Sequence, residues 1–551
     1  MTEPICITSQ CGLCQLDVAY GEEVAVCTLY HSCSRRESRV LTSLLDSFRN
    51  WKRMIAESLC DGLVCDHADG LGISCHPECL RIAELECSER LMKATRHTFQ
   101  STVGEKHRRR NWMLDCLSSK LQAGIAIPDR KTHVVRLPPE LCRLVAEQLL
   151  SYYATTLARS LWKPPEQCRI TLDRTIWCNL IHFEGGEYIS SLSNFKSQQH
   201  PELLFRPSTN IPDRLYTREN HLGLTKALFS NPDHLPVFGC IPNTWWRTFD
   251  LSERNLTILG ESDGIKLRAL TVVGQNPVAW SVPPIEGVRF AYINLRYRGD
   301  ASRMVAFSCN DPLITGYSVL WNYQIAMIHA HKDGEDLSFY QLMPNARWLY
   351  MPVDQGELIT EIYTGSGWIG RDSAIGVNQP VQTRSRIFYG TVDGHINILA
   401  FENQFQTKFG QHFQQPTSSP HSIITNQEDY FYNSLDLTGL VIIAPCRTKG
   451  DKAISGLLLH FADGHRDSVG EVRLDSLGQT LNISEKETVV LGFRRHDGRY
   501  PYVSDIATSS SKFESGFISV IRLFAAGRLE WFWSHRQCYV IYEGERSLET
   551  A

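Results

Sequence analysis

Cysteine and histidine residues at metal-ligand spacing crowd the first part of this sequence. Ten of its 18 cysteines fall within the first 87 residues of a 551-residue chain. Zinc is held by four thiolate or imidazole ligands, and short turns with two intervening residues supply such ligands in pairs. Because thiolates predominate here, we expect Zn²⁺ in closed sites that stabilise a small module rather than in a catalytic site.

The candidate ligands fall into four groups along the chain. Cys11 and Cys14 are separated by two residues, and so are His76 and Cys79. This spacing favours His76 over the adjacent Cys75 as a ligand. Four groups would make two sites, as in RING, PHD and LIM modules, although none of those spacings is matched strictly. An alternative interpretation is that some of these cysteines are simply small buried apolar residues. The ten candidates are Cys11, Cys14, Cys27, His31, Cys33, Cys60, Cys65, His67, His76 and Cys79.

The cellular setting expected from the sequence agrees with metal binding. The first residues lack the basic and then apolar pattern of a secretory signal, so we expect an intracellular protein of the cytoplasm, the nucleus or both. Disulfides are rare there, and clustered cysteines point to metal. The sequence has no run of 18 apolar residues, which argues against a membrane partner. Its net charge of −4 argues against nucleic acid as a partner.

The distribution of residue types along the sequence predicts a multidomain α+β protein. Residues 1–95 would form the zinc-stabilised module, and residues 96–165 a helical segment. From about residue 170, short β-branched and aromatic runs alternate with Gly, Asn, Asp and Pro, which is typical of β-structure. We therefore expect a large, mainly antiparallel β-region in two parts, 166–300 and 301–545, like a β-prism or a β-sandwich.

A segment in the helical part resembles the first half of an F-box. LPPELCRLVAEQLL (137–150) opens with Leu-Pro and Glu-Leu and continues with apolar residues at helical spacing. In F-box proteins this face docks on the Skp adaptor of a cullin-type ubiquitin ligase. The second half of the motif is missing after residue 150, and an ordinary amphipathic helix is the alternative. The resemblance implies contact with a partner through Leu137, Pro138, Glu140, Leu141, Val145, Leu149 and Leu150.

Over nearly its full length the chain resembles a group of filamentous-fungal proteins of largely uncharacterised function. In that group a Cys-x2-Cys and a His-x2-Cys element precede an F-box-like helix and a long β-rich region. This resemblance implies an architecture more than an activity. The motifs that carry it are CGLC (11–14), CHPECL (75–80), LPPEL (137–141), FEGGEYISSLSN (183–194), NHLGL (220–224), TWWR (244–247), SDGIKLR (262–268), GYSVLW (316–321), GELITEIY (356–363) and GLLLHFADGHRDSVGEV (456–472).

Two further motifs carry less weight. Gly365, Gly367 and Gly370 match the dinucleotide fingerprint, but no helical pattern follows them to receive a pyrophosphate. The basic run KHRRR (106–110) is either a solvated linker or a patch for nuclear transport or phosphate contact. No set of nucleophile, base and orienting residue can be assembled, so we do not expect an enzyme.

The function expected from these features is that of a non-enzymatic adaptor for protein partners. If the F-box-like helix binds a Skp-type adaptor, the chain would be a substrate-recognition subunit of a cullin-type ubiquitin ligase. A zinc-finger regulator in the nucleus and a lectin-like protein with a carbohydrate ligand are the alternatives.

Overall fold

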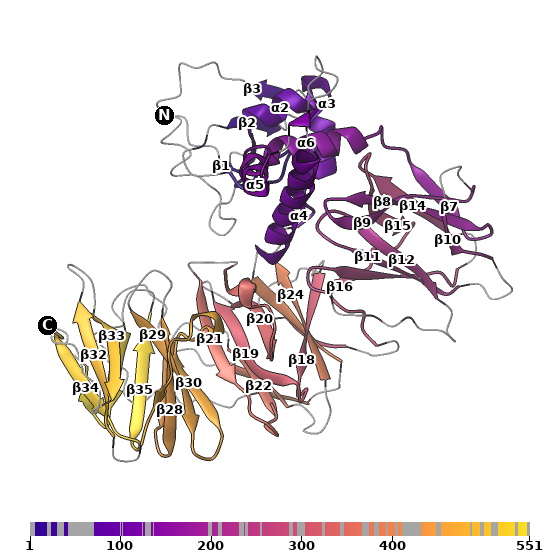
Figure 1. Ribbon diagram of the computed structural model, residues 1–551. Helices are drawn as coiled ribbons and strands as arrows, with labels where there is room; N and C mark the ends of the chain where they lie inside the picture. Colours follow the sequence, from indigo (N-terminus) through magenta and orange to yellow (C-terminus); the bar gives the residue numbers. More distant parts are fainter. Residues whose placement is uncertain are drawn as a thin grey trace. The chain divides into compact units, whose positions relative to one another are not determined.

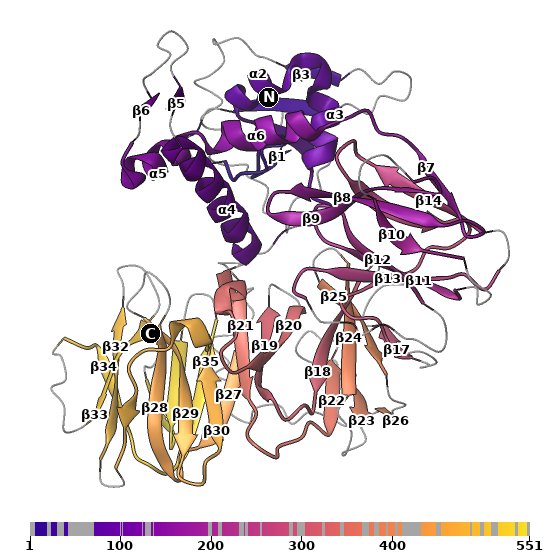
Figure 2. The same ribbon diagram turned by 45° about the vertical axis from the view of Figure 1, so that its right-hand side comes forward.

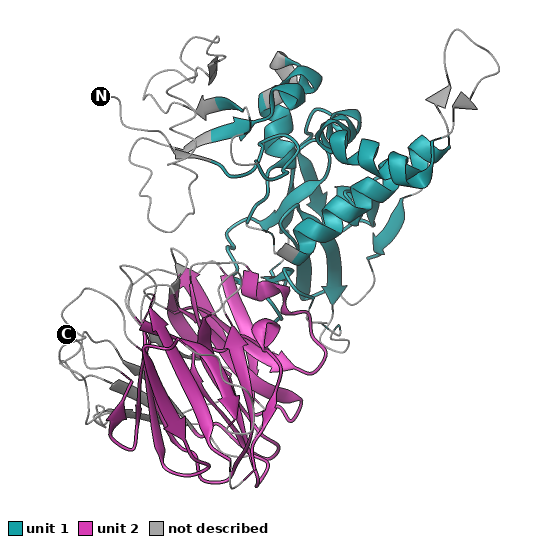
Figure 3. Cartoon of the chain, turned by 60° about the vertical axis from the view of Figure 1, so that its left-hand side comes forward, with its two compact units in different colours: residues 1–283 teal, residues 284–551 magenta. Residues whose placement is uncertain are grey.

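In a computed structural model the chain forms two compact units, residues 1–283 (unit 1) and residues 284–551 (unit 2), coloured separately in Figure 3. The structure describes residues 6–18, 22, 24–29, 38–41, 71–99, 101, 103–123, 125–126, 134–135, 137–196, 201–207, 212–230, 236, 238, 241–253, 256–285, 290–294, 303–321, 325–341, 346–365, 374–378, 385–392, 395–402, 406–409, 431–447, 453–484, 487–495, 501–508, 516–534 and 538–547.

Unit 1 begins with a small sheet in the strand order β1-β4-β2-β3. Its strands are β1 (Cys6–Ile7), β2 (Ala25–Leu29), β3 (Ser38–Leu41) and β4 (Leu71–Cys75). β1 runs parallel to β4, whereas β2 is antiparallel to both of its neighbours. The parallel pairing matters for the site, because it brings the chain that leaves β1 close to the chain that leaves β4.

Among the described residues five helices follow β4, and two of them begin at a proline. Pro77 and Pro139 each occupy the first helical position, where the missing N–H has no partner to lose. The helices, labelled in Figure 1, are α2 (Pro77–Ala83), α3 (Leu85–Thr95), α4 (Val103–Gln122), α5 (Pro139–Gln148) and α6 (Leu150–Leu161). A two-stranded ladder of β5 (Ile125–Ala126) and β6 (Val134–Val135) separates α4 from α5. None of the described helices is both long and apolar enough to cross a membrane.

The helices share one apolar core with the turn at residues 11–14 and with Phe183, Tyr188, Leu222 and Ile265 from later in unit 1. Small residues let the helices come close: Ala146 of α5 and Ala154 and Ala158 of α6 are buried. The same cluster contains Cys11 and Cys14 from the first turn and residues from the later β-sheets. Its other buried members are Leu13, Cys75, Cys79, Ala83, Leu91, Met92, Ala94, Met113, Leu114, Leu117, Leu150, Phe183, Tyr188, Leu222 and Ile265.

The β-rich part of unit 1 contains three sheets whose neighbouring strands run antiparallel. Their orders are β10-β8-β9, β15-β14-β7 and β12-β11-β13-β16. Buried side chains from all three sheets meet in a second core of this unit. The strands are β7 (Cys168–Thr171), β8 (Ile176–Phe183), β9 (Gly186–Ser193), β10 (Glu202–Phe205), β11 (Arg214–Glu219), β12 (Leu224–Ser230), β13 (Trp245–Asp250), β14 (Thr257–Ser262), β15 (Leu267–Val272) and β16 (Ala279–Trp280).

Unit 2 is built from antiparallel sheets, many of whose strands are labelled in Figure 2. Its described residues also include the short 3-10 helices η1 and η2. Its first part has β17 (Ala291–Asn294), β18 (Arg303–Cys309), β19 (Ile314–Trp321), β20 (Ile325–Lys332), η1 (Leu337–Gln341), β21 (Arg347–Pro352), β22 (Glu361–Gly365), β23 (Ala374–Asn378), β24 (Ser385–Val392), β25 (His395–Phe401) and β26 (Gln406–Phe409). Hydrogen-bonded neighbouring strands in this part follow the orders β18-β24-β25-β17, β20-β19-β21 and β22-β23-β26.

The last part of unit 2 packs three sheets around one apolar core. The sheets are β30-β29-β28-β31, β33-β32-β34 and β27-β35-β36-β37, and Trp531 and Phe493 are fully buried between them. The elements are β27 (Phe431–Asp436), β28 (Leu440–Arg447), β29 (Ile454–Phe461), β30 (Arg466–Gly470), η2 (Leu474–Ser476), β31 (Leu481–Asn482), β32 (Val489–Arg495), β33 (Pro501–Thr508), β34 (Ser519–Leu523), β35 (Arg528–Trp533), β36 (Cys538–Tyr542) and β37 (Glu545–Arg546). The predicted fold class is thus confirmed: a Cys/His cluster, a helical segment and a large antiparallel β-region.

Candidate metal centre

The first ligand pair lies on a tight turn directly after β1. The backbone N–H of Gln15 donates to the carbonyl of Cys11 at 2.9 Å, and that of Cys11 donates to the carbonyl of Leu16 at 3.0 Å. Gln15 adopts a positive φ of 56°, which closes the turn. The turn brings Cys11 and Cys14 to the same side, and both are completely buried.

The second pair lies where β4 passes into α2. His76 caps α2 in an extended conformation, and Cys79 follows in the first turn of that helix. His76 Nδ1 lies 3.3 Å from the sulfur of Cys14 and 3.8 Å from that of Cys79. The His76 backbone N–H donates to the sulfur of Cys11 at 3.4 Å. The four ligand atoms lie within 4.8 Å of one another, so the spacing-based pairs converge on one point.

The far side of the His76 ring has a carboxylate beside it. Its Nε2 lies 3.4 Å from Glu22 Oε1. Histidines that bind metals commonly donate their second nitrogen to a carboxylate, which fixes the tautomer and turns the other nitrogen towards the ion. Glu22 is therefore placed to hold Nδ1 of His76 towards the three sulfurs.

Burial and neighbouring groups shift the pKa values of Cys11, Cys14 and His76. Hydrogen bonds to the sulfurs of Cys11 and then of Cys79 raise the pKa of His76 to about 10. Burial, followed by the neighbouring sulfur of Cys11, raises the pKa of Cys14. Hydrogen bonds from Cys14, and then from Cys75 and Cys79, lower the pKa of Cys11. A divalent cation replaces the protons of such groups and offsets the negative charge of buried thiolates.

The donor set fits a closed structural site. Three thiols and one imidazole are the ligands of a four-coordinate zinc site, and such a site leaves no position open for a substrate. The group Cys11, Cys14, His76 and Cys79 could therefore bind a metal ion such as zinc. The three thiolates would hold the ion, and His76 would be the fourth ligand.

Gly12 lets the turn fit tightly against β4. Its N–H donates to the carbonyl of Ser74 at 2.7 Å, and its carbonyl accepts from Thr95 Oγ1 at 3.0 Å. A Cβ at this position would lie 2.4 Å from Cγ2 of Ile73, well inside contact distance. Packing thus favours glycine at position 12, directly after Cys11.

A buried ion pair supports the same turn from α4. The Arg109 guanidinium forms two hydrogen bonds with the carboxylate of Glu184, one of them at 2.6 Å from Nη2. It also donates to the carbonyls of Cys14 and Gln15. The two charged side chains are only 6% and 3% exposed. Arg109 therefore connects the turn that carries Cys11 and Cys14 to the β8–β9 hairpin, where Glu184 lies.

This arrangement changes the interpretation of the basic run KHRRR (106–110). The run lies within α4, which belongs to unit 1. Besides the pair of Arg109 with Glu184, Lys106 Nζ lies 2.8 Å from Asp17 Oδ1. The run is thus part of a helix rather than a linker: Arg109 points into the core, whereas His107, Arg108 and Arg110 are exposed.

The side chains of the other six predicted ligands lie outside the described residues. Cys27 lies in β2, but its side chain is outside the described residues, and so are His31, Cys33, Cys60, Cys65 and His67. Cys75 is described, and its sulfur donates to the sulfur of Met92 at 3.7 Å. His76, which the spacing favoured over Cys75, is the member of the group.

The F-box-like segment forms α5 and presents apolar side chains to solvent. Leu141 is 47% exposed and Leu144 is 59% exposed, and Val145 and Leu149 are exposed as well. Pro138 and Glu140 are also exposed, Leu137 is half-buried, and Leu150 is buried in the core.

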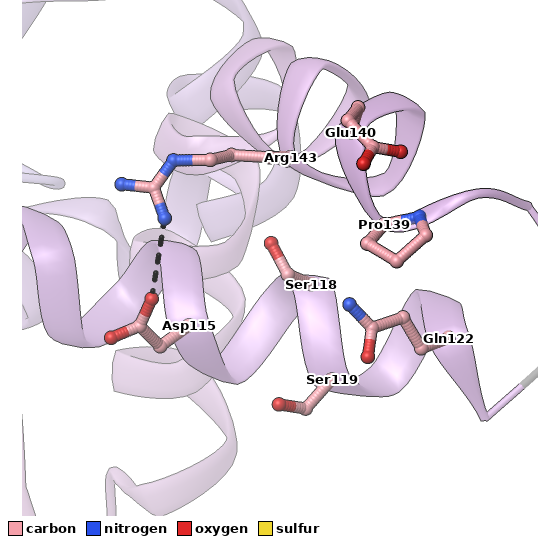
Figure 4. A pocket seen from close by; sticks show the side chains of 7 residues that line it. All are labelled: Asp115, Ser118, Ser119, Gln122, Pro139, Glu140 and Arg143. Atoms are coloured by element: carbon pink, nitrogen blue, oxygen red, sulfur yellow. Dashed lines mark hydrogen bonds and ion pairs between the residues drawn. The ribbon is translucent and has the colours of Figure 1, made fainter.

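Small side chains form the inner face of α5. Cys142 and Ala146 are buried there, and α5 packs against α4. A groove of about 450 Å³ runs between the two helices, and Figure 4 shows Arg143 reaching across it to Asp115 at 3.5 Å. Its lining is mostly polar: Asp115, Ser118, Ser119, Gln122, Pro139, Glu140 and Arg143.

No protein-family model matches the chain, and no curated protein matches its sequence.

Proposed function

We propose that this chain is a non-enzymatic adaptor that presents α5 to a Skp-type partner of a cullin-type ubiquitin ligase. The observation that carries the proposal is the outward apolar face of α5. Leu141, Val145 and Leu149, which the F-box resemblance marks as docking residues, are exposed although they are apolar. Exposed apolar clusters of this kind mark interaction sites, and helices use them to dock in apolar grooves.

The packing of α5 supports the same interpretation. Leu144 adds a fourth exposed apolar side chain, while the buried face consists of Cys142 and Ala146. A helix that served only the core would bury its large residues and expose its small ones. Here the small residues face α4, and the large ones remain available to a partner.

We propose further that Cys11, Cys14, His76 and Cys79 bind Zn²⁺ and hold unit 1 in shape. The site would be structural, because four protein ligands complete the tetrahedron. It lies in the core that also buries Leu150 of the segment after α5. The metal would thereby contribute to the stability of the helical part that displays the docking face.

Capture of a purified Skp-type adaptor by the full chain tests the docking proposal. The double variant Leu141→Ala with Leu149→Ala should lose capture with little change in melting temperature, because substitution of exposed side chains costs little. Leu203→Ala is the matched control, since Leu203 is an exposed leucine of β10 at 46%. Leu150→Ala should instead destabilise unit 1 by ~2–5 kcal/mol, because Leu150 is buried.

Two results would refute the docking proposal. One is a folded double variant that still captures the adaptor as well as the wild type does. The other is a folded wild-type chain that never captures it. The nuclear-regulator alternative loses one residue of the basic run as a phosphate contact, because Arg109 is paired with Glu184 inside unit 1.

A further inference from the structure

A second group of potential ligands lies in unit 2, where β20 turns towards η1. His329 and His331 are two residues apart on β20, so their side chains extend from the same face of the strand. The strand ends at Lys332, and Gly334, with a φ of 74°, makes the turn that follows. This turn sends Glu335 back over the face from which the two imidazoles extend.

The carboxylate of Glu335 meets both imidazoles. His329 Nε2 lies 3.0 Å from Glu335 Oε2, and His331 Nδ1 lies 2.5 Å from Glu335 Oε1. One ligand atom from each of the three residues can be chosen so that all lie within 4.8 Å of one another. Three donor atoms from three side chains thus converge, as the ligands of a metal site do.

Groups behind the imidazoles fix their orientation. His331 Nε2 lies 2.7 Å from Ser318 Oγ and 3.2 Å from the hydroxyl of Tyr340, and all three residues are fully buried. These hydroxyls hold the ring so that Nδ1 faces Glu335. The ring of Phe339 packs on that of His329 with centroids 4.1 Å apart. Outer partners of this kind orient histidine ligands in metal sites.

The group is reachable from solvent on one side. His331 is buried, whereas the side chains of His329 and Glu335 are 30% and 19% exposed. An ion could therefore enter past His329, and water could complete its coordination. Two imidazoles and one carboxylate suit Zn²⁺ and differ from the thiolate-rich group of unit 1.

We propose that His329, His331 and Glu335 form a second zinc site, open to water at one position. Its sequence signature is His-x-His-x3-Glu, in which the strand supplies the paired imidazoles and the Asp-Gly turn returns the carboxylate. The site is independent of the proposed adaptor function and of the Cys/His group, because its three ligands and the hydroxyls behind them all belong to unit 2.

Zinc stoichiometry of the full chain tests this proposal. Elemental analysis after dialysis against Zn²⁺ should show that His329→Gln and Glu335→Gln each bind one ion fewer per chain than the wild type. After loading with Co²⁺, both variants should keep the thiolate-to-cobalt charge-transfer bands of the Cys/His group, whereas Cys14→Ser should lose them. These bands distinguish the two sites in the same molecule.

A matched control is available in unit 1. His182 Nε2 lies 3.7 Å from Glu187 Oε1 on an exposed surface, and among the described residues this pair belongs to no metal-ligand group. His182→Gln should leave the stoichiometry unchanged. Added Zn²⁺ should raise the melting temperature of the wild type, because binding stabilises the native state. The increase should be smaller for folded Glu335→Gln.

The outcome that would overturn the proposal is a wild-type zinc content in both folded variants. In that case His329, His331 and Glu335 are only a hydrogen-bonded cluster. Circular dichroism of the metal-free variants checks that they are folded. If Glu335→Gln does not fold, His329→Gln alone decides, because His329 is the most exposed of the three side chains.

Discussion

Glu184→Gln is expected to lower the free energy of unfolding of unit 1 by ~3–5 kcal/mol, because it leaves the Arg109 guanidinium buried without a counter-charge. The glutamine keeps the shape of the side chain, so the loss comes from charge rather than from a cavity. Arg109 is 6% exposed and makes two hydrogen bonds to Glu184, so water cannot replace the lost partner. The variant should also release metal faster, because Arg109 donates to the carbonyl of Cys14.

An exposed pair of the same chemistry provides the control. Arg159 and Glu84 form an ion pair with side chains that are 43% and 66% exposed. Glu84→Gln should therefore cost less than ~1 kcal/mol. Replacing both Arg109 and Glu184 by apolar residues should cost less than Glu184→Gln alone, because no buried charge is left unpaired.

Urea unfolding followed by tryptophan fluorescence and by metal release measures both effects. Trp112 lies in α4, close to Gly185 beside the ion pair, and reports on unit 1. Equal losses for Glu184→Gln and Glu84→Gln would refute the reasoning. So would an unfolding free energy of Glu184→Gln within ~1 kcal/mol of the wild type, because a buried charge would then carry no penalty.

Three further changes have defined outcomes. Gly12→Ala should cost ~1–3 kcal/mol in thermal unfolding and weaken metal retention, because its Cβ would lie 2.4 Å from Ile73; wild-type values for both would contradict this. Cys14→Ser should remove one metal ion per chain and lower the unfolding midpoint of unit 1 but not that of unit 2, as elemental analysis and calorimetry can show. Burial, and then His221, lower the pKa of His97 to about 2, so below pH ~6.5 the unfolded chain binds a proton that the native chain does not. Stability should therefore fall on acidification towards pH 5, by up to ~1.4 kcal/mol per pH unit, and less steeply in His97→Gln; equal slopes in urea titrations would disprove this.

The spacing of the candidate ligands predicted the two pairs correctly, but it did not predict which pairs lie together. Two-residue spacing identified both pairs, Cys11 with Cys14 and His76 with Cys79, and the structure brings these four together. Which pairs lie together depends on the parallel pairing of β1 with β4, across more than sixty residues of sequence. Nothing in local spacing encodes such a long-range pairing. The position of Glu22 beside His76 could not be predicted either, because the sequence around a loop carboxylate does not indicate which residue it contacts.

Burial of charged and apolar residues was the harder property to predict. The run KHRRR is basic whether it is solvated or packed, and only the partner Glu184, 75 residues further on, decides the burial of Arg109. In α5 the helical period was correctly predicted, but the apolar residues do not form its inner face. Cys142 and Ala146 form that face because they are small enough for α4 to approach. His329 and His331 were overlooked, although two alternating histidines followed by the Asp-Gly pair 333–334 were a usable signal.

The shared core of unit 1 has a consequence for synthesis of the chain. Cys14 lies in the same apolar cluster as Ile265, and the adjacent Lys266 donates to the carbonyl of Ala94 at 3.0 Å. The turn that carries Cys11 and Cys14 therefore cannot be fully enclosed until roughly 250 more residues have left the ribosome, which takes on the order of 10–50 s at ordinary elongation rates. During that interval the nascent thiols are accessible to oxidants and to competing ions. A metal ion bound by this group would therefore be taken up before or while the segments around Phe183, Leu222 and Ile265 close over the turn.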